Sequence, residues 1–327
     1  MYNQKIAEMV KLYSQLPTFG KVFVVVQATS PNFDRLQQLV KTDSEGKVGI
    51  YATVAEAYDA ATTNSNDVIL LDGWSTSHKV ASMLTISKSR LHFVGMDGSG
   101  RKIGTRTLIS NTGAGVAADV AMVKITGTGC SFRNIAFKNN WTVAQNVSSI
   151  LDDSVQSYFE NCDIESLGSA HLTNAAAASL IINGVESVYK NCTIGQQTLL
   201  ATVASGQQVL ISASNSARNI FEKCLFQTWT SQITHCFIRA AASSIDSSQH
   251  TFIDCEFVNR SNAGGGGVEL TAAVATSATL GGRLNFSFPR IFGAADLATA
   301  AAGATGVFVV SPVLAAAASD CVGVQAS

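Results

Sequence analysis

The chain has 327 residues, of which 22 are basic and 23 acidic, and its formal net charge is −1. Because there is no basic stripe, nucleic acid is a poor candidate for a partner. Only 14% of the residues are charged, against about 25% in a typical soluble protein, which suits a surface that packs into an assembly. No apolar run approaches the roughly 20 residues of a membrane span, so no membrane partner is expected.

Residues 1–50 are predicted to form an N-terminal helix and a lead-in or docking segment. The first 16 residues contain charges and no continuous apolar stretch. They do not fit a signal peptide, so we expect folding in a cytoplasm, where cysteines stay reduced. Apolar residues at helical spacing predict a small amphipathic helix that either caps the body of the protein or docks on a neighbouring subunit. They are Ile6, Met9, Val10, Tyr13 and Leu16.

A second helix is predicted over residues 53–63, because apolar residues again recur at helical spacing. They are Val54, Ala57, Tyr58 and Ala61. Thr53 is positioned as the N-cap, and Glu56 completes a capping box. The turn "NSND" and the strand "VILLDG" follow. Such a helix would close the open apolar end of a solenoid.

This passage resembles the opening of pectin-lyase-like right-handed β-helix proteins. The matching residues are Thr53, Val54, Ala57, Ala60, Asp67, Ile69, Gly73 and Gly95. The segment "GKVFVVVQATSPNFDRLQQLVKTDSEGKVGIYATVAEAYDAA" resembles a lead-in of tailed-phage virion proteins, notably head decoration or capsid-associated proteins with β-helix bodies. The first resemblance says little about function, because that fold carries lyases, hydrolases, tailspikes and inert structural proteins.

A repeated motif of aromatic, any residue, polar, Cys, any residue, apolar occupies the middle of the chain. The copies are "SFRNIAFKN", "YFENCDIES", "VYKNCTIGQ", "IFEKCLFQT" and "TFIDCEFVN", with Ile in place of Cys in the first. Successive copies lie 27 to 32 residues apart, a period typical of stacked repeats. No copy has a helical period, so the sequence predicts an all-β fold: a parallel β-helix over residues 51–262 with an N-terminal α/β cap. The resemblance implies the right-handed, pectin-lyase-like form.

The spacing inside the motif predicts a bend. Phe159 and Cys162 are three residues apart, whereas residues that face the same side of a flat strand are two apart. If both face inward, the residue before Cys162 must turn the chain, and Asn tolerates the left-handed conformation that a corner needs. We therefore expect Asn134, Asn161 and Asn191 to stack as an amide ladder. Lys223 and Asp254 replace Asn in the last two copies, where the ladder should end.

The cysteines of the motif predict an inward column of Cys162, Cys192, Cys224 and Cys255. A metal or redox site is the alternative, but the spacing of two to four residues typical of zinc ligands is absent. Free cysteine is among the most buried residue types, and Ile135 fills the same position in the first copy. We expect buried, reduced thiols, and neither a metal nor another cofactor.

After Asn259 the motif is no longer recognisable. The stretch "SNAGGGG" reads as a flexible break, and further strands such as "GGRLNFSFPRIFG" follow it. Residues 263–327 are therefore predicted to cap the far end of the coil or to form a subunit contact.

No catalytic residue is predicted. Asp152 and Asp153 are the adjacent acid pair of the β-helix region, and further acids are expected to project outward after the bend, namely Asp163, Glu165, Asp254 and Glu256. Glycosidases need two opposed carboxylates. The histidines are scattered, at positions 78, 92, 171, 235 and 250. The tryptophans Trp74, Trp141 and Trp229 are possible platforms for sugar stacking.

Two functions remain open. The first is a non-enzymatic virion structural protein that decorates or cements a phage capsid or forms a fibre base. It would be made in a bacterial host and would bind capsid or other virion proteins and itself, as a dimer or trimer. The alternative is a phage-borne lyase or hydrolase of tailspike type that degrades polysaccharide.

Overall fold

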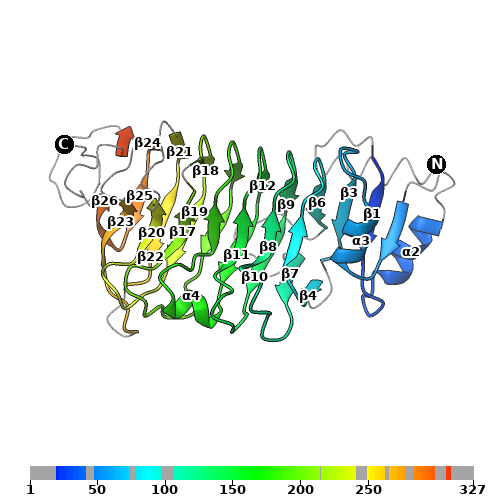
Figure 1. Ribbon diagram of the computed structural model, residues 1–327, viewed down its shortest axis with the longest axis horizontal. Helices are drawn as coiled ribbons and strands as arrows, with labels where there is room; N and C mark the ends of the chain where they lie inside the picture. Colours follow the sequence, from blue (N-terminus) through cyan, green and yellow to red (C-terminus); the bar gives the residue numbers. More distant parts are fainter. Residues whose placement is uncertain are drawn as a thin grey trace.

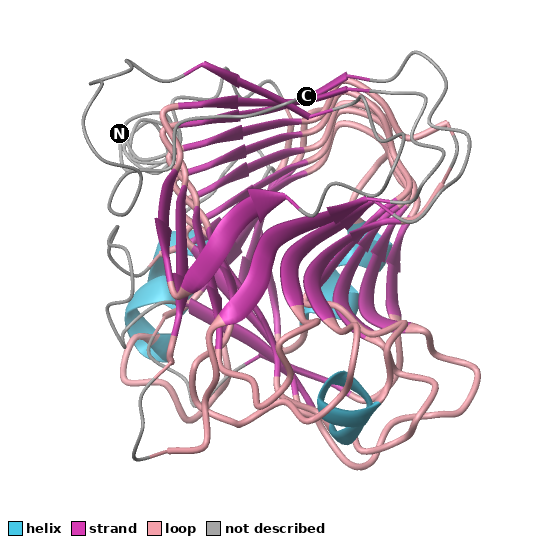
Figure 2. Ribbon diagram, turned by 90° about the vertical axis from the view of Figure 1, so that its left-hand side faces the viewer, coloured by secondary structure: helices cyan, strands magenta, loops and turns pink. Residues whose placement is uncertain are grey.

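The computed structural model describes residues 20–41, 48–73, 78–96, 107–213, 215–240, 249–261, 265–276, 283–298 and 307–310. These residues coil into a right-handed parallel β-helix of about eight turns, which confirms the predicted fold class. Figure 1 shows the coils side by side along the long axis of the molecule. Figure 2, which looks down that axis, shows the strand faces around a common interior.

Three parallel sheets form the faces of the coil. Sheet A contains, in order, β2 (Val48–Tyr51), β1 (Val22–Val25), β3 (Val68–Leu71), β6 (His92–Gly95), β9 (Ser131–Arg133), β12 (Tyr158–Glu160), β15 (Val188–Lys190), β18 (Ile220–Glu222), β21 (Gln249–Ile253), β24 (Arg283–Ser287) and β27 (Val307–Val310). Sheet B contains β4 (His78–Val80), β7 (Thr107–Asn111), β10 (Ile135–Asn139), β13 (Asp163–Ser166), β16 (Thr193–Gly195), β19 (Leu225–Thr228), β22 (Glu256–Asn259) and β25 (Arg290–Phe292). Sheet C contains β5 (Leu84–Ile86), β8 (Ala121–Ile125), β11 (Ser148–Asp152), β14 (Leu180–Ile182), β17 (Gln207–Ile211), β20 (Cys236–Ala240), β23 (Leu270–Thr276) and β26 (Ala294–Ala298).

Along the chain, each full coil runs from sheet C through a turn to sheet A, through a bend to sheet B, and through a longer loop to sheet C of the next coil. Equivalent residues therefore lie over one another. The clearest result is a stack of seven buried aromatic rings on sheet A, whose successive centroids are 4.6 to 5.0 Å apart. Its members are Phe93, Phe132, Phe159, Tyr189, Phe221, Phe252 and Phe286.

The bend between sheets A and B lies at the residue before the cysteine. Asn134, Asn161 and Asn191 have φ angles of 58°, 54° and 51°, which is the left-handed region that Asn tolerates better than most residues. Lys223 and Asp254 adopt the same conformation, with φ of 53° and 51°. The backbone therefore keeps the same left-handed corner in the two coils where Lys and Asp replace Asn.

A second left-handed corner, which the sequence did not predict, lies between sheets C and A. Gln156, Glu186 and Arg218 have φ angles of 61°, 61° and 54° there. Gly129 takes the equivalent place one coil earlier, with φ of 68°. Arg90 takes this place in the coil before Gly129, with φ of 55°. Because Arg, Gly, Gln and Glu all occupy the corner, no single residue type marks it in the sequence.

The N-terminal elements join the coil directly. α3 (Val54–Ala60) begins at the N-cap Thr53 with the expected capping box, and its buried side chains belong to the main core together with Ile69 of β3. α2 (Phe33–Lys41) buries Leu36 against Val22 and Val68. Strands β1 and β2 extend sheet A beyond β3, so the predicted boundary at residue 50 falls inside β2.

The coil does not stop at Asn259, contrary to the expectation from the sequence. Strands β23 to β27 extend all three sheets, so part of the segment 263–327 belongs to the coil itself. The motif was missed because Phe288 takes the bend position, with φ of 54°, and Pro289 follows where other coils have Cys. The backbone geometry is retained although both marker residues are replaced.

We expect Asn161→Ala to destabilise the protein by about 1–2 kcal/mol, because a Cβ without a local hydrogen bond is unfavourable in the left-handed region. Asn161→Gly should cost less, since glycine adopts this conformation freely. The measurement is the free energy of unfolding in urea for both variants. An equal decrease in the free energy of unfolding for the Ala and Gly variants would contradict a backbone origin of the effect.

Candidate functional site

The adjacent acids Asp152 and Asp153 cannot act as a pair, because they face opposite sides of sheet C. The Asp152 side chain is fully buried; its Oδ2 accepts a hydrogen bond from the Tyr189 hydroxyl at 2.6 Å, and Oδ1 one from the Ser154 amide at 3.2 Å. Burial, followed by the charge of Asp152, raises the pKa of Tyr189 well above its ordinary value, so the hydroxyl keeps its proton and donates it. Asp153 is exposed, and its Oδ2 lies 3.5 Å from Lys124 Nζ.

The outer face of sheet B carries the acids predicted to project outward. Asp163 and Glu165 alternate with the buried Ile164 on β13, so both face away from the core, about 6.6 Å apart along the strand. Asp163 is only 7% exposed, and Glu165 Oε2 lies 3.1 Å from Lys138 Nζ on the preceding coil. Glu256 lies three strands further along the sheet, about 14 Å away, which is wider than the 5–9.5 Å between glycosidase carboxylates.

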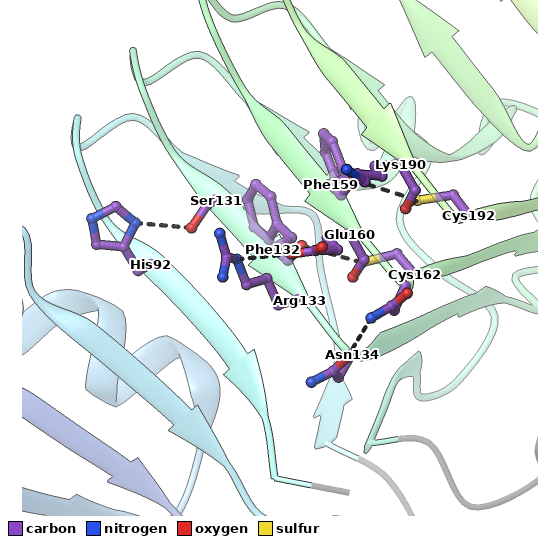
Figure 3. A network of polar contacts seen from close by, with 11 residues as sticks. His92, Ser131, Phe132, Arg133, Asn134, Phe159, Glu160, Cys162, Lys190 and Cys192 are labelled. Atoms are coloured by element: carbon purple, nitrogen blue, oxygen red, sulfur yellow. Dashed lines mark hydrogen bonds and ion pairs between the residues drawn. The ribbon is translucent and has the colours of Figure 1, made fainter. Parts of the chain in front are cut away.

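Six ion pairs join residues in the described part of the chain, and each connects one coil to its neighbour. They are Lys124–Asp153, Arg133–Glu160, Lys138–Glu165, Lys190–Glu222, Arg218–Glu186 and Arg290–Glu256, with N–O distances of 2.7 to 3.5 Å. Figure 3 shows Arg133 beside Glu160 on the outer face of sheet A. Most of these side chains are partly buried at the surface. Surface pairs contribute about 0–1 kcal/mol each, but they occupy most of the carboxylates that a catalytic site on these faces would use.

The asparagines of the bend lie along one edge of the coil. The side-chain Nδ2 of Asn161 donates to Oδ1 of Asn134 at 3.3 Å (Figure 3). The backbone N–H groups of Asn161 and Asn191 donate to the carbonyls of Lys190 and Glu222 on the following coil, at 3.0 and 2.9 Å. These contacts join coil to coil.

The four motif cysteines face inward and are buried. Each Sγ lies 3.2 to 3.7 Å from the backbone carbonyl of the aromatic residue one coil earlier, as Cys162 does to Phe132. Burial raises the pKa of Cys224 well above its ordinary value, which suppresses the thiolate needed for metal binding or redox chemistry. Among the described residues, no three His, Cys, Asp or Glu side chains gather to hold a metal ion.

All five histidines are buried. Desolvation lowers the pKa of His92, His171 and His250 to about 4 and that of His235 to about 3. Desolvation also lowers the pKa of His78. His235 lies in an interior seam of polar side chains, where its Nε2 is 3.2 Å from Thr228 Oγ1. With pKa values this low, these four buried rings are neutral at pH 7.

The two tryptophans that the structure describes offer little stacking surface. Trp141 is fully buried and donates from Nε1 to the carbonyl of Thr112 at 3.2 Å. One face of Trp229 is covered by the Arg260 guanidinium, whose carbon lies 4.4 Å from the ring centroid. Trp74 and the candidate docking residues Ile6, Met9, Val10, Tyr13 and Leu16 lie outside the described residues. Within the part of the chain that the structure covers, no helix has the length and apolarity of a membrane span.

Comparison with known proteins gives a fold and no family. No family model and no curated protein matches the chain. The pectin methylesterase of Aspergillus niger is similar over 92% of this chain and 93% of its own, with a TM-score of 0.50 and 17% identity. Pectin methylesterase PemA from Erwinia chrysanthemi is similar over 90% of this chain and 94% of its own, with a TM-score of 0.47 and 12% identity. Geobacillus virus E2 ORF18 is similar over 73% of this chain and 49% of its own, with a TM-score of 0.46 and 13% identity. At such identities the first similarity shows the β-helix fold alone, and the two weaker ones support no further argument.

We expect Cys224→Ser to destabilise the protein by about 1–3 kcal/mol, the cost of burying a poorly paired hydroxyl. Cys224→Ala is the control, because it removes the sulfur without adding a polar group. Urea unfolding of both variants under reducing conditions measures the effect. Unchanged stability of the serine variant, or a metal that copurifies with the wild type in proportion to its cysteines, would contradict an inert column.

The buried histidines predict a dependence of stability on pH. Their pKa values in the folded state lie below the ordinary 6.5, so the unfolded chain binds more protons below pH 6.5. The free energy of unfolding is therefore full above pH 6.5 and falls as the pH drops toward 4, by at most about 1.4 kcal/mol per pH unit for each histidine. Urea unfolding at pH 7 and pH 5 measures this slope. His171→Gln should make the slope shallower, and an identical slope would show that His171 does not contribute.

Proposed function

We propose that this protein is a non-enzymatic structural subunit of a phage particle, which decorates or cements the capsid or forms a fibre base. The observation that carries the non-enzymatic part is the use of outward carboxylates in ion pairs between coils. The link to a virion rests on the resemblance of the lead-in segment that starts at Gly20. Support also comes from the low charge of the chain.

A stacked coil suits a mechanical role. Each coil adds about 4.8 Å, so eight coils form a body roughly 38 Å long whose interior is filled by columns of like residues. Such a body needs no ligand to stay rigid, because backbone pairing, ring stacking and ion pairs all join neighbouring coils. Capsid or other virion proteins would be its partners, and residues 1–50 are the proposed docking segment.

The proposal predicts that particles assembled without this protein lack a defined density. Cryo-electron microscopy of particles made with and without its gene is the measurement. Identical particles in the two preparations would overturn the virion assignment.

Docking through the N-terminal helix predicts a further outcome. A variant lacking residues 1–19 should keep the β-sheet circular dichroism and the thermal unfolding of the full chain and lose only helical signal, because the coil begins with the Lys21 amide bonded to Asp67 at 2.7 Å. It should no longer bind particles in co-sedimentation. Retained binding would count against docking through Ile6, Met9, Val10, Tyr13 and Leu16.

A polysaccharide-active enzyme is the second candidate, favoured by the position of Asp163 and Glu165 on one outer face beside Lys138. The test is incubation of the purified protein with host envelope polysaccharide, followed by assays for new sugar ends, unsaturated products and released esters. We expect none. Product formation that is lost in Asp163→Asn and Glu165→Gln, and kept in the control Glu256→Gln, would replace the structural assignment.

A further inference from the structure

The loops that lead from sheet B to sheet C carry almost no charge. In five successive coils they span residues 112–120, 140–147, 167–179, 196–206 and 229–235, and Asp119 is the one Asp, Glu, Lys or Arg among them. Asp119 is buried, and its Oδ2 accepts a hydrogen bond from the Met83 amide at 2.9 Å. His171 and His235, the histidines of these loops, are buried too. We call the surface of these five loops the uncharged loop face.

The five loops form one continuous surface. Figure 2 shows them, with the short helix α4 (Ser169–Thr173), gathered on one side of the coil. Backbone hydrogen bonds of 2.9 to 3.1 Å join one loop to the next, from Val147 to Val120, from Ala178 to Val147 and from Thr202 to Leu172. The loops are therefore held in place by the same stacking that orders the strands.

Apolar side chains are exposed on this face. Val116, Val120, Leu199 and Ile233 are 49%, 42%, 38% and 57% exposed. The remaining exposed positions are mostly Ala, Ser and Thr, whose small side chains allow close approach. The face also borders an apolar cluster on the outside of sheet C that contains Leu151, Ile181 and Ala178.

The other sides of the coil differ from this face in charge. The outer face of sheet A carries alternating charges such as Arg133, Glu160, Lys190 and Glu222, and the outer face of sheet B carries Lys138, Glu165, Glu256 and Arg290. The corner between sheets C and A carries Glu186 and Arg218. A partner that met those sides would have to match a fixed pattern of charges, whereas the uncharged loop face imposes none.

We propose that the uncharged loop face is the contact between copies of this chain in a closed homo-oligomer. Its charge pattern favours a second copy, because two identical faces brought together by rotation oppose loops that carry no exposed charge of their own. The exposed Arg260, which covers Trp229 and donates to the Gln197 carbonyl, lies at the end of the face. Cyclic symmetry is the usual arrangement of homo-oligomers, and charged residues are depleted at interface centres. In the five loops, 21 described residues are exposed, which lies within the roughly 20–30 residues per side of a standard interface. A strongly charged partner would lose hydration here without gaining a counter-charge.

The test is the molar mass in solution, measured by analytical ultracentrifugation across a concentration series. The wild-type chain is expected at two or three times its mass of 34.3 kDa. The triple variant Val116→Glu, Leu199→Glu, Ile233→Glu should sediment at 34.3 kDa, with unchanged circular dichroism. The control is Val155→Glu with Ile220→Glu, which alters apolar side chains of similar exposure, 39% and 37%, away from this face. It should remain oligomeric.

Three outcomes would overturn the proposal: a monomeric wild type, a triple variant that keeps the oligomeric mass, and a control that dissociates as completely as the triple variant. If the triple variant does not fold, the single variants Val116→Glu and Ile233→Glu decide, because each should raise the dissociation constant at least tenfold. The result is independent of particle binding, so an oligomer that binds no virion would refute the proposed function and leave this contact standing.

Discussion

Parallel pairing in register places each side chain directly over its equivalent in the next coil. A residue in this protein is therefore selected mainly by the residues above and below it, and the column is the unit of stability. The seven stacked rings on sheet A gain from burial and from offset ring contacts at the same time. The left-handed bend keeps each ring in that column, because it sets the direction in which the chain leaves sheet A.

Tyr189 and Asp152 show how strongly neighbouring coils are coupled. Tyr189 is the one hydroxylated ring in the described aromatic stack, and Asp152 interrupts a column that has Ile125 and Ile182 on either side. A buried hydroxyl or carboxylate alone would be costly. The two exceptions lie one coil apart and bind each other at 2.6 Å. Tyr189→Phe would remove the donor to Asp152 Oδ2, and Asp152→Ile would remove the acceptor of the Tyr189 hydroxyl, so each change alone would leave a buried polar atom without this partner.

The sequence was sufficient for the coil where chemical identity repeats, and insufficient where only backbone geometry repeats. The spacing of three residues between Phe159 and Cys162 correctly predicted a bend at Asn161. Phe288 adopts the same φ as Asn161, although no Asn marks that bend in the sequence. The orientation of Asp152 and Asp153 was also accessible, because adjacent strand residues face opposite sides. By contrast, no local pattern indicates the burial of Asp163 or the position of Arg260 over Trp229, because both depend on neighbouring coils that are distant in the sequence.

The same division separates the parts of the chain that hold the fold from those free to serve another purpose. Strand positions are constrained by their columns, so a substitution there must suit two neighbouring coils. The loops after sheet B vary in length from one coil to the next while the strands on either side keep their register. Since the core does not require these loops to be uncharged, the near absence of charge in them calls for a cause outside the core. Contact with another surface is such a cause, and solvent exposure alone would favour the opposite composition.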